Sequence, residues 1–143
     1  MNKKIFILIL ILLLGMAGIL VSFFLNKQIS GFDNYANFEK INYNLEGKNL
    51  QLLKADTSEK WTKGLMYFRK LEGVDGMIFI FPDKQKRTFW NKNTYLDLDL
   101  YWIEGEKVVG KSSLPSIEKS KEIVIVESPK AVDKVIELQT SNL

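Results

Sequence analysis

The chain contains neither cysteine nor histidine among its 143 residues. Without cysteine there are no disulfides, no thiolate nucleophiles and no thiol for lipid attachment. Without histidine the usual zinc sites and every Ser-His or Cys-His catalytic pair are excluded as well. Metal binding would have to use carboxylates and carbonyls, which suit only hard cations such as calcium or magnesium. We therefore expect no metal site and no cofactor.

A concentrated charge of either sign is also missing. The formal net charge is +3, but Lys3 and Lys4 precede a long apolar segment, and the residues from Asn26 onward carry 18 basic and 17 acidic side chains. The basic residues of this part are scattered singly, with no stripe of aromatics between them. Nucleic-acid-binding domains show a clustered basic face instead. We expect no nucleic-acid partner.

Charged residues are absent from residues 5–25, IFILILILLLGMAGILVSFFL. As a helix this segment spans roughly 31 Å at about 1.5 Å per residue, which matches a hydrocarbon core of about 30 Å. We interpret residues 1–25 as a cytoplasmic Lys-Lys tip and a single transmembrane anchor. The membrane is then the first expected partner.

A cleaved signal peptide is the competing interpretation of this segment. The sequence Gly15-Met16-Ala17 offers small residues at the spacing that cleavage requires, after a positively charged start. Cleavage there would leave an exposed apolar end, and the run exceeds the usual h-region of about 7 to 15 residues. We therefore favour a retained anchor. Because Lys27 is the only basic residue in the dozen after the segment, the positive-inside tendency places the C-terminal domain outside the cytoplasm.

The rest of the chain divides into a polar tether, residues 26–38, and a domain, residues 39–143. Apolar residues in the domain recur in short alternating runs between turn signals, which predicts strands. The predicted strands cover residues 41–45, 50–55, 77–81, 89–90, 96–103, 107–111 and 122–127. A capping box at Asp56-Thr-Ser-Glu59 opens one short helix, predicted over Thr57–Phe68. The period of residues 131–138 fits a helix or a strand. The pattern indicates a mostly β domain, a sandwich or a squashed barrel.

Four linked motifs are similar to those of a known family. They are Gly64-Leu65-Met66, the run GMIFIF from Gly76, the run FWNKNT from Phe89, and Leu98-Asp99-Leu100. In order and spacing they resemble the domain of unknown function 192, over roughly residues 48–138. The resemblance implies a compact β-sandwich of jelly-roll type, often secreted or membrane-attached in bacteria, with a last strand within residues 131–138. It implies no activity, because none is established for the family.

The chain departs from the family pattern at three places. Asn91 stands where the family usually has Met, and Asp97 stands where it usually has Pro. An Arg commonly follows the aromatic after the GLM motif, whereas here that place is Phe68 and Arg69 comes one residue later. The departures make this chain more polar near its FWNKNT motif.

Polar side chains gather around the strand predicted at residues 96–103. The candidate ligand-binding residues are Arg69, Trp90, Lys92, Asn93, Thr94 and Asp99. Lys92 would meet an anionic group, Asn93 and Asp99 would orient the ligand, and Trp90 would stack against it. The structural alternative is that Asn and Thr side chains bond backbone groups of a turn, with Asp99 accepting such bonds or pairing with Lys92. For Asp97 we expect a solvated face.

The expected function is a non-catalytic binding or envelope-associated module, whose partner is an envelope polymer, a small ligand or a protein. The alternative is a small hydrolase or lyase in which Asp99 and Lys92 act as acid and base. That chemistry needs burial to move both pKa values toward neutrality. Nothing in the sequence demonstrates such burial.

Overall fold

The computed structural model describes Gly18 and residues 37–140, and the chain divides into two compact units, Met1–Asn37 and Phe38–Leu143. The predicted anchor, apart from Gly18, and the predicted tether up to residue 36 lie outside the described residues. Within the described residues no helix combines the length and apolar character needed to cross a membrane. The account below concerns the second unit.

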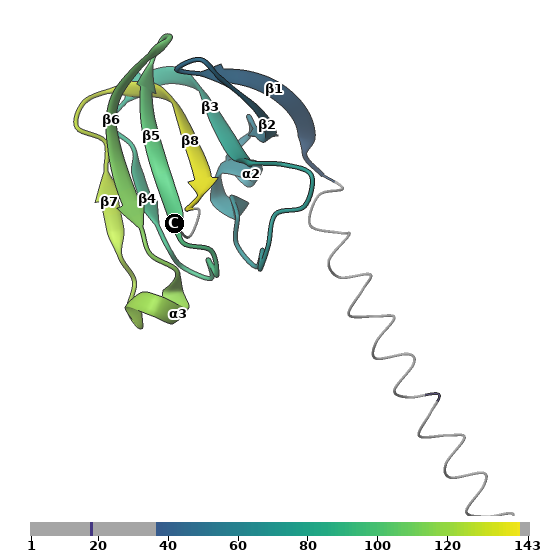
Figure 1. Ribbon diagram of the computed structural model, residues 1–143. Coiled ribbons are helices and arrows are strands. Elements are labelled where there is room, and N and C mark those ends of the chain that lie inside the picture. The colour runs from purple at the N-terminus through teal and green to yellow at the C-terminus, as the bar shows by residue number, and fades with distance from the viewer. Residues whose placement is uncertain (1–17, 19–36, 141–143) are drawn as a thin grey trace, which may run out of the picture. The chain divides into compact units, whose positions relative to one another are not determined.

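The second unit is mostly β, as its alternating sequence predicts (Figure 1). Its strands in residues 37–140 are β1 (Glu39–Leu45), β2 (Lys48–Ala55), β3 (Gly76–Gln85), β4 (Thr88–Trp90), β5 (Leu98–Glu104), β6 (Lys107–Leu114), β7 (Ile125–Glu127) and β8 (Val132–Gln139). Its helices there are α2 (Ser58–Lys63) and α3 (Ile117–Ser120), so the prediction of a single short helix was wrong. The segment whose period was ambiguous is therefore strand β8.

Six strands form one mixed sheet in the order β1-β2-β3-β8-β5-β6, and β4 pairs with β7 in a separate two-stranded sheet. The pair β2–β3 is parallel and the other pairs are antiparallel. A parallel pair needs a crossover connection, and the segment between β2 and β3 carries α2. The last strand, β8, lies between β3 and β5 in the interior of the sheet (Figure 1).

One face of the large sheet is buried in an aliphatic cluster. Its buried members come from β1, β2, β3, β5 and β8. They are Leu45, Leu50, Leu52, Ile78, Ile103 and Ile136. Burying a side chain of this size contributes about 1.5–3 kcal/mol, so the cluster is a main source of stability.

The opposite face of the large sheet is covered by aromatic packing from β4 and α2. Phe89 of β4 meets Phe79 and Trp102 edge to face, with ring centroids 4.8 and 5.6 Å apart. Trp61 of α2 lies 5.1 Å from Phe81 of β3, centroid to centroid. The small sheet and α2 therefore both lie against this second face.

Helix α2 ends earlier than the predicted Thr57–Phe68. The capping box predicts Asp56 as the N-cap, but the N-cap is the next residue, Thr57, whose side chain accepts a hydrogen bond from the backbone N–H of Lys60. Gly64 then adopts φ +45, which favours glycine, and its N–H donates to the Lys60 carbonyl. A Cβ atom at this position would also lie 3.3 Å from the Phe79 ring. The helix stops here because the chain turns in against β3.

Gly76 begins β3 at a point where β8 passes extremely close. A Cβ atom on Gly76 would overlap the backbone oxygen of Glu137. No other residue fits without moving one strand. The glycine of the GMIFIF run therefore sets the separation of β3 and β8, and with it the position of Glu137.

Candidate ligand-binding pocket

A pocket of about 520 Å³ opens between α2, the turn that follows it, β3 and β4. Aromatic rings make up much of its wall. They are Trp61, Phe79, Phe81, Phe89 and Trp90. The indole N–H of Trp61 donates to the carbonyls of Ala55 and Ile80, at 3.0 and 3.1 Å. These bonds fix the ring between two strands, so this wall of the pocket is already formed.

One carboxyl group reaches the pocket from β8. Glu137 is only 4 % exposed, and the residues opposite it on the neighbouring strands are Met77 and Leu100. Among residues 37–140 its carboxyl has no hydrogen-bond or ion-pair partner. Burial in these apolar surroundings raises the pKa of Glu137 from 4.5 to about 8. The group is therefore mostly protonated at neutral pH and is able to donate a hydrogen bond.

Three basic side chains border the same pocket, namely Lys63, Lys86 and Arg87. Lys86 pairs with Glu127 of β7 at 3.0 Å. Lys63 has no carboxylate partner within the described part of the chain, and its ammonium lies 5.6 Å from the Phe38 ring centroid. The ionised side chains at this pocket are consequently all positive.

Arg87 is held in place by its own surroundings. Its guanidinium lies 3.9 Å from the centroid of the Phe81 ring and donates to the Asp83 carboxylate at 2.6 Å. Its backbone N–H donates to the Ser128 hydroxyl. The Nε atom is buried and has no hydrogen-bond partner among the described residues. Arg87 thus joins the β3–β4 turn to the pocket wall, with Asp83 offsetting part of its charge.

Two of the six predicted site residues, Trp90 and Thr94, line this pocket. Trp90 is 48 % exposed, and the Thr94 hydroxyl donates to the Lys92 carbonyl at 3.3 Å. Lys92 itself is exposed, with its ammonium 5.8 Å from the Trp90 ring centroid. Asn93 has φ +54 and donates from its side chain to the Tyr67 hydroxyl at 2.8 Å. Lys92 and Asn93 lie outside the pocket lining.

Asp99 lies on the other face of the large sheet. Alternation along β5 places Leu100 beside Glu137, so the neighbouring Asp99 points to the opposite side. Its carboxylate accepts a hydrogen bond from the Ser113 hydroxyl at 3.1 Å, at the edge of a second hollow of about 260 Å³. Within the described residues no hydrogen bond or ion pair joins Asp99 to Lys92.

Arg69, the remaining predicted site residue, is on the surface. Its guanidinium pairs with Glu118 of α3 at 3.2 Å and lies 4.2 Å from the Tyr95 ring centroid. These contacts link the turn after α2 to α3. Arg69 does not line the aromatic pocket.

Asn91, which replaces the usual Met of the family pattern, is fully buried. Its amide nitrogen donates to the Pro115 carbonyl at 2.9 Å and to the Ser120 hydroxyl at 2.8 Å. Its amide oxygen accepts from the Val124 N–H at 2.8 Å. One side chain therefore fastens the α3 segment to the end of β4. We expected a polar departure here, but not this structural role.

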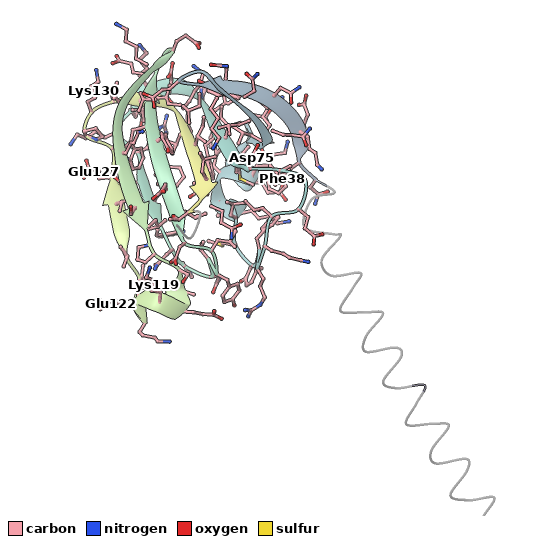
Figure 2. All side chains as sticks on the ribbon, in the orientation of Figure 1. Phe38, Asp75, Lys119, Glu122, Glu127 and Lys130 are labelled. Atoms are coloured by element: carbon pink, nitrogen blue, oxygen red, sulfur yellow. The ribbon has the colours of Figure 1, made fainter. Side chains whose placement is uncertain are left out.

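Asp97 does not have the solvated role that strand alternation predicts. Its carboxylate accepts a hydrogen bond from the backbone N–H of Ser116 at 2.8 Å and pairs with Lys119 of α3 at 3.4 Å. The bond from Ser116, and then the Lys119 contact, lower the pKa of Asp97. Lys119 and Glu122 lie together at the α3 end of the unit (Figure 2). Asp97 thus helps to fix the start of α3.

The charged pocket residues Glu137, Lys63, Lys86 and Arg87 are not among the site residues that the sequence predicts. The alternation of residues 131–138 does not distinguish Glu137 from a polar residue on the exposed side of a strand. The burial of Glu137 depends on the place of β8 between β3 and β5, which the sequence does not show. Among the described residues no group of three or more acidic side chains is arranged to hold a metal ion.

A family model described as Uncharacterized ACR, the domain of unknown function 192 (DUF192), matches residues 41–142. The chain belongs to the DUF192 family. The resemblance inferred from the four motifs is thereby confirmed. The family is uncharacterised, so membership by itself assigns neither a ligand nor a reaction to the pocket.

Two solved structures share the DUF192 chain's fold. One is a protein from Sinorhizobium meliloti 1021 that carries the provisional name transcription regulator. It matches with a TM-score of 0.58 and 28% sequence identity, and the match covers 73% of this chain and 81% of that chain. The other is a protein of unknown function from Novosphingobium aromaticivorans DSM 12444, with a TM-score of 0.57 and 21% identity, covering 71% and 73% of the two chains. No curated protein matches.

Replacing Asn91 should destabilise the domain. Asn91→Ala leaves the Val124 N–H and the Pro115 carbonyl without this partner, and a buried unsatisfied group costs about 1–3 kcal/mol. We expect a loss of roughly 2–4 kcal/mol in the free energy of unfolding, measured by urea denaturation. The neighbouring exposed Lys92 provides the control, since Lys92→Ala should change stability by less than about 0.5 kcal/mol. Equal effects of the two substitutions would contradict the role of Asn91.

Glu137 should make the domain less stable as the pH rises. Between its unfolded pKa of 4.5 and its folded pKa of about 8, the folded protein holds a proton that the unfolded chain has lost. The free energy of unfolding should therefore fall across this pH range, by a Glu137 contribution on the order of 4 kcal/mol. Glu137→Gln should remove that slope, whereas Glu122→Gln at an exposed position should keep it. Parallel pH profiles for wild type and Glu137→Gln would refute the assignment.

Proposed function

We propose that this domain is a non-catalytic binding module that takes a small amphipathic ligand into the aromatic pocket. The observation that carries the proposal is Glu137, a buried carboxyl that borders open space and has no partner among residues 37–140. A buried polar group without a hydrogen bond costs about 1–3 kcal/mol. A ligand that forms a hydrogen bond with the Glu137 carboxyl recovers this cost. The unpartnered carboxyl therefore favours ligand binding.

The dimensions and lining of the pocket support a small-molecule ligand. Its volume of about 520 Å³ falls within the roughly 300–1,000 Å³ of typical ligand sites. Rings supply apolar contact area, while Ser58, Thr62 and Thr88 add polar side chains to the lining. Such a mixture of apolar wall and few polar groups is what small-molecule sites share.

The geometry gives less support to the alternative enzyme, a hydrolase or lyase using Asp99 and Lys92. Asp99 bonds to Ser113 on one face of the sheet, and Lys92 is exposed beside Trp90. Acid–base catalysis requires both groups within reach of one substrate. Among the described pocket residues, Glu137 has no second carboxylate beside it that would supply such a pair.

The regulator name of the Sinorhizobium protein does not lead us to propose DNA binding. From Asn26 onward the basic and acidic residues nearly balance. Many of the basic side chains are in ion pairs, among them Lys54, Lys60, Lys86 and Arg87. Binding to the phosphate backbone needs an uncompensated basic surface.

We further propose that residues 5–25 anchor the chain in a membrane and that the domain lies outside the cytoplasm, where an envelope polymer or a protein could also be its partner. The support is the uncharged 21-residue segment and the two lysines before it.

We also propose that the two sheets form a small β-sandwich of jelly-roll type. The edge-to-face packing of Phe89 between them supports this description.

The absence of cysteine makes the membrane orientation easy to test. A single cysteine at the exposed Lys48, introduced as Lys48→Cys, should react with a membrane-impermeant maleimide in intact cells. A cysteine introduced as Asn2→Cys should react only after lysis, and the labelled chain should keep its full mass of 16.5 kDa. Labelling of Asn2→Cys in intact cells would reverse the orientation, and a shorter labelled product would indicate a cleaved signal peptide.

Binding can be followed at single tryptophans in the full chain. Trp61 and Trp90 line the pocket, whereas Trp102 is fully buried and donates to Ser112 at 2.9 Å. With indole ¹⁵N labels, the neutral probe 2-naphthalenemethanol should shift the signals of Trp61 and Trp90 and leave that of Trp102 in place. A probe that only partitions into detergent micelles does not shift the signals of Trp61 and Trp90 selectively.

A variant that fills the pocket supplies the matching control. Met66 lines the pocket, so Met66→Trp should weaken binding of the probe at least about tenfold, while Val109→Trp outside it should have no effect. If Trp61 and Trp90 do not shift, or if Met66→Trp binds as well as wild type, the proposed function fails.

A further inference from the structure

We propose that the ligand of this pocket is a small organic anion with an apolar body, whose negative group is bound at the pocket mouth by Lys63. The inference rests on the proposed function and adds the chemical class of the ligand. It comes from the distribution of charge around the pocket, together with the position and hydrogen-bonding state of Glu137.

The charged groups at the pocket have one sign. Lys63, Lys86 and Arg87 are cationic, while Glu137, the one acid in the described lining, is mostly protonated at neutral pH. The carboxylates that pair with Lys86 and Arg87 are those of Glu127 and Asp83, and neither lines the pocket. An anion entering here meets no ionised acid in the lining, because desolvation keeps Glu137 neutral.

Lys63 is the basic residue best placed to bind the anion. Arg87 already donates to Asp83, and Lys86 already pairs with Glu127. Lys63 is half-buried at the end of α2, and in the described part of the chain it has no carboxylate partner. Among residues 37–140 its ammonium has a cation–π contact with Phe38, at 5.6 Å from the ring centroid, and no hydrogen bond. Three donors of Lys63 therefore remain for an anionic ligand.

The protonated carboxyl of Glu137 argues against a cationic ligand. A protonated carboxyl donates its hydrogen, so the group that it bonds must be an acceptor, such as a carbonyl, ether or hydroxyl oxygen. An ammonium group only donates and would require Glu137 to ionise among Met77 and Leu100. It would also have to approach past three positive side chains. The ligand therefore presents an acceptor, not a cation, to the inner end of the pocket.

Three probes with the same aromatic body test this inference in the full chain. They are 2-naphthoate, 2-naphthalenemethanol and 2-naphthylmethylammonium, which are anionic, neutral and cationic at pH 7. Binding is read from the indole signals of Trp61 and Trp90, with Trp102 as the internal reference. We expect 2-naphthoate to bind about tenfold more tightly than the neutral probe, and the cation to bind most weakly.

Two lysines of α2 form a matched pair of variants. Lys63→Gln should lower the affinity for 2-naphthoate to about that for 2-naphthalenemethanol and so abolish the preference for the anion. Lys60→Gln removes the same charge from the same helix, but Lys60 is outside the lining and pairs with Asp56. That variant should keep the preference. Equal effects of the two variants would show general attraction to a positive surface and would overturn the assignment to Lys63.

The pH dependence gives a second, independent readout. The groups that face Glu137 are the apolar Met77 and Leu100 on its neighbouring strands and the basic Lys63, Lys86 and Arg87 around the pocket. Ionisation of Glu137 above about pH 8 adds a negative charge inside the pocket. Binding of 2-naphthoate should therefore weaken by about tenfold between pH 7 and pH 9 in wild type and remain constant in Glu137→Gln.

The outcomes separate this inference from the function on which it rests. If 2-naphthalenemethanol shifts Trp61 and Trp90 but 2-naphthoate binds no better, the domain is a binding module and the anionic ligand is wrong. If 2-naphthylmethylammonium binds best, Glu137 ionises to meet a cation and the inference is reversed. If no probe shifts these signals, both proposals fail.

Discussion

The close approach of β8 to β3 at Gly76 is the constraint on which the rest of this domain depends. Because no Cβ atom fits beneath the Glu137 backbone, the two strands pack at a separation that only glycine allows. The last strand of the chain can then enter between β3 and β5 and complete the large sheet. Both faces of β8 are consequently covered, one by the aliphatic cluster and the other by the aromatic pocket. Glu137, in the covered middle of β8, therefore borders open space at the pocket.

The close packing of β8 against β3 determines the surroundings of Glu137. The pleat of β8 points Ile136 into the aliphatic cluster and Glu137 to the opposite face, between Met77 and Leu100. A leucine at this place would stabilise the sheet without the cost of burying an acid. The domain instead keeps a carboxyl that has no partner among the described residues and holds it beside a preformed aromatic wall. Carboxyl groups with strongly shifted pKa values are concentrated at functional sites.

Local signals in the sequence located seven of the eight described strands, the region where α2 begins and the family motifs, because alternation, capping and turn chemistry act within a few residues. The same signals left β8 open between helix and strand and did not indicate α3. The predicted end of α2 was wrong, because the helical spacing of Trp61, Leu65 and Phe68 continues past Gly64, whereas the helix itself ends there. The candidate site was only partly recovered, with Trp90 and Thr94 at the pocket and Asp99 on the other face. Glu137 depends on strand order, and a pattern of apolar residues in one chain does not determine which strand lies inside a sheet.

The alternation of side chains along β4 explains the roles of the residues in the FWNKNT run. Phe89 points inward to meet Phe79 and Trp102, Trp90 stands at the pocket rim, and Asn91 is buried in hydrogen bonds to the segment around α3. Strand β4 pairs with β7 through only three residues, so backbone pairing alone holds it weakly. The aromatic contact on one side and the amide bonds on the other supply the rest. Because β4 forms one wall of the pocket, Phe89 and Asn91 hold that wall in place, Phe89 against β3 and β5 and Asn91 against the segment around α3.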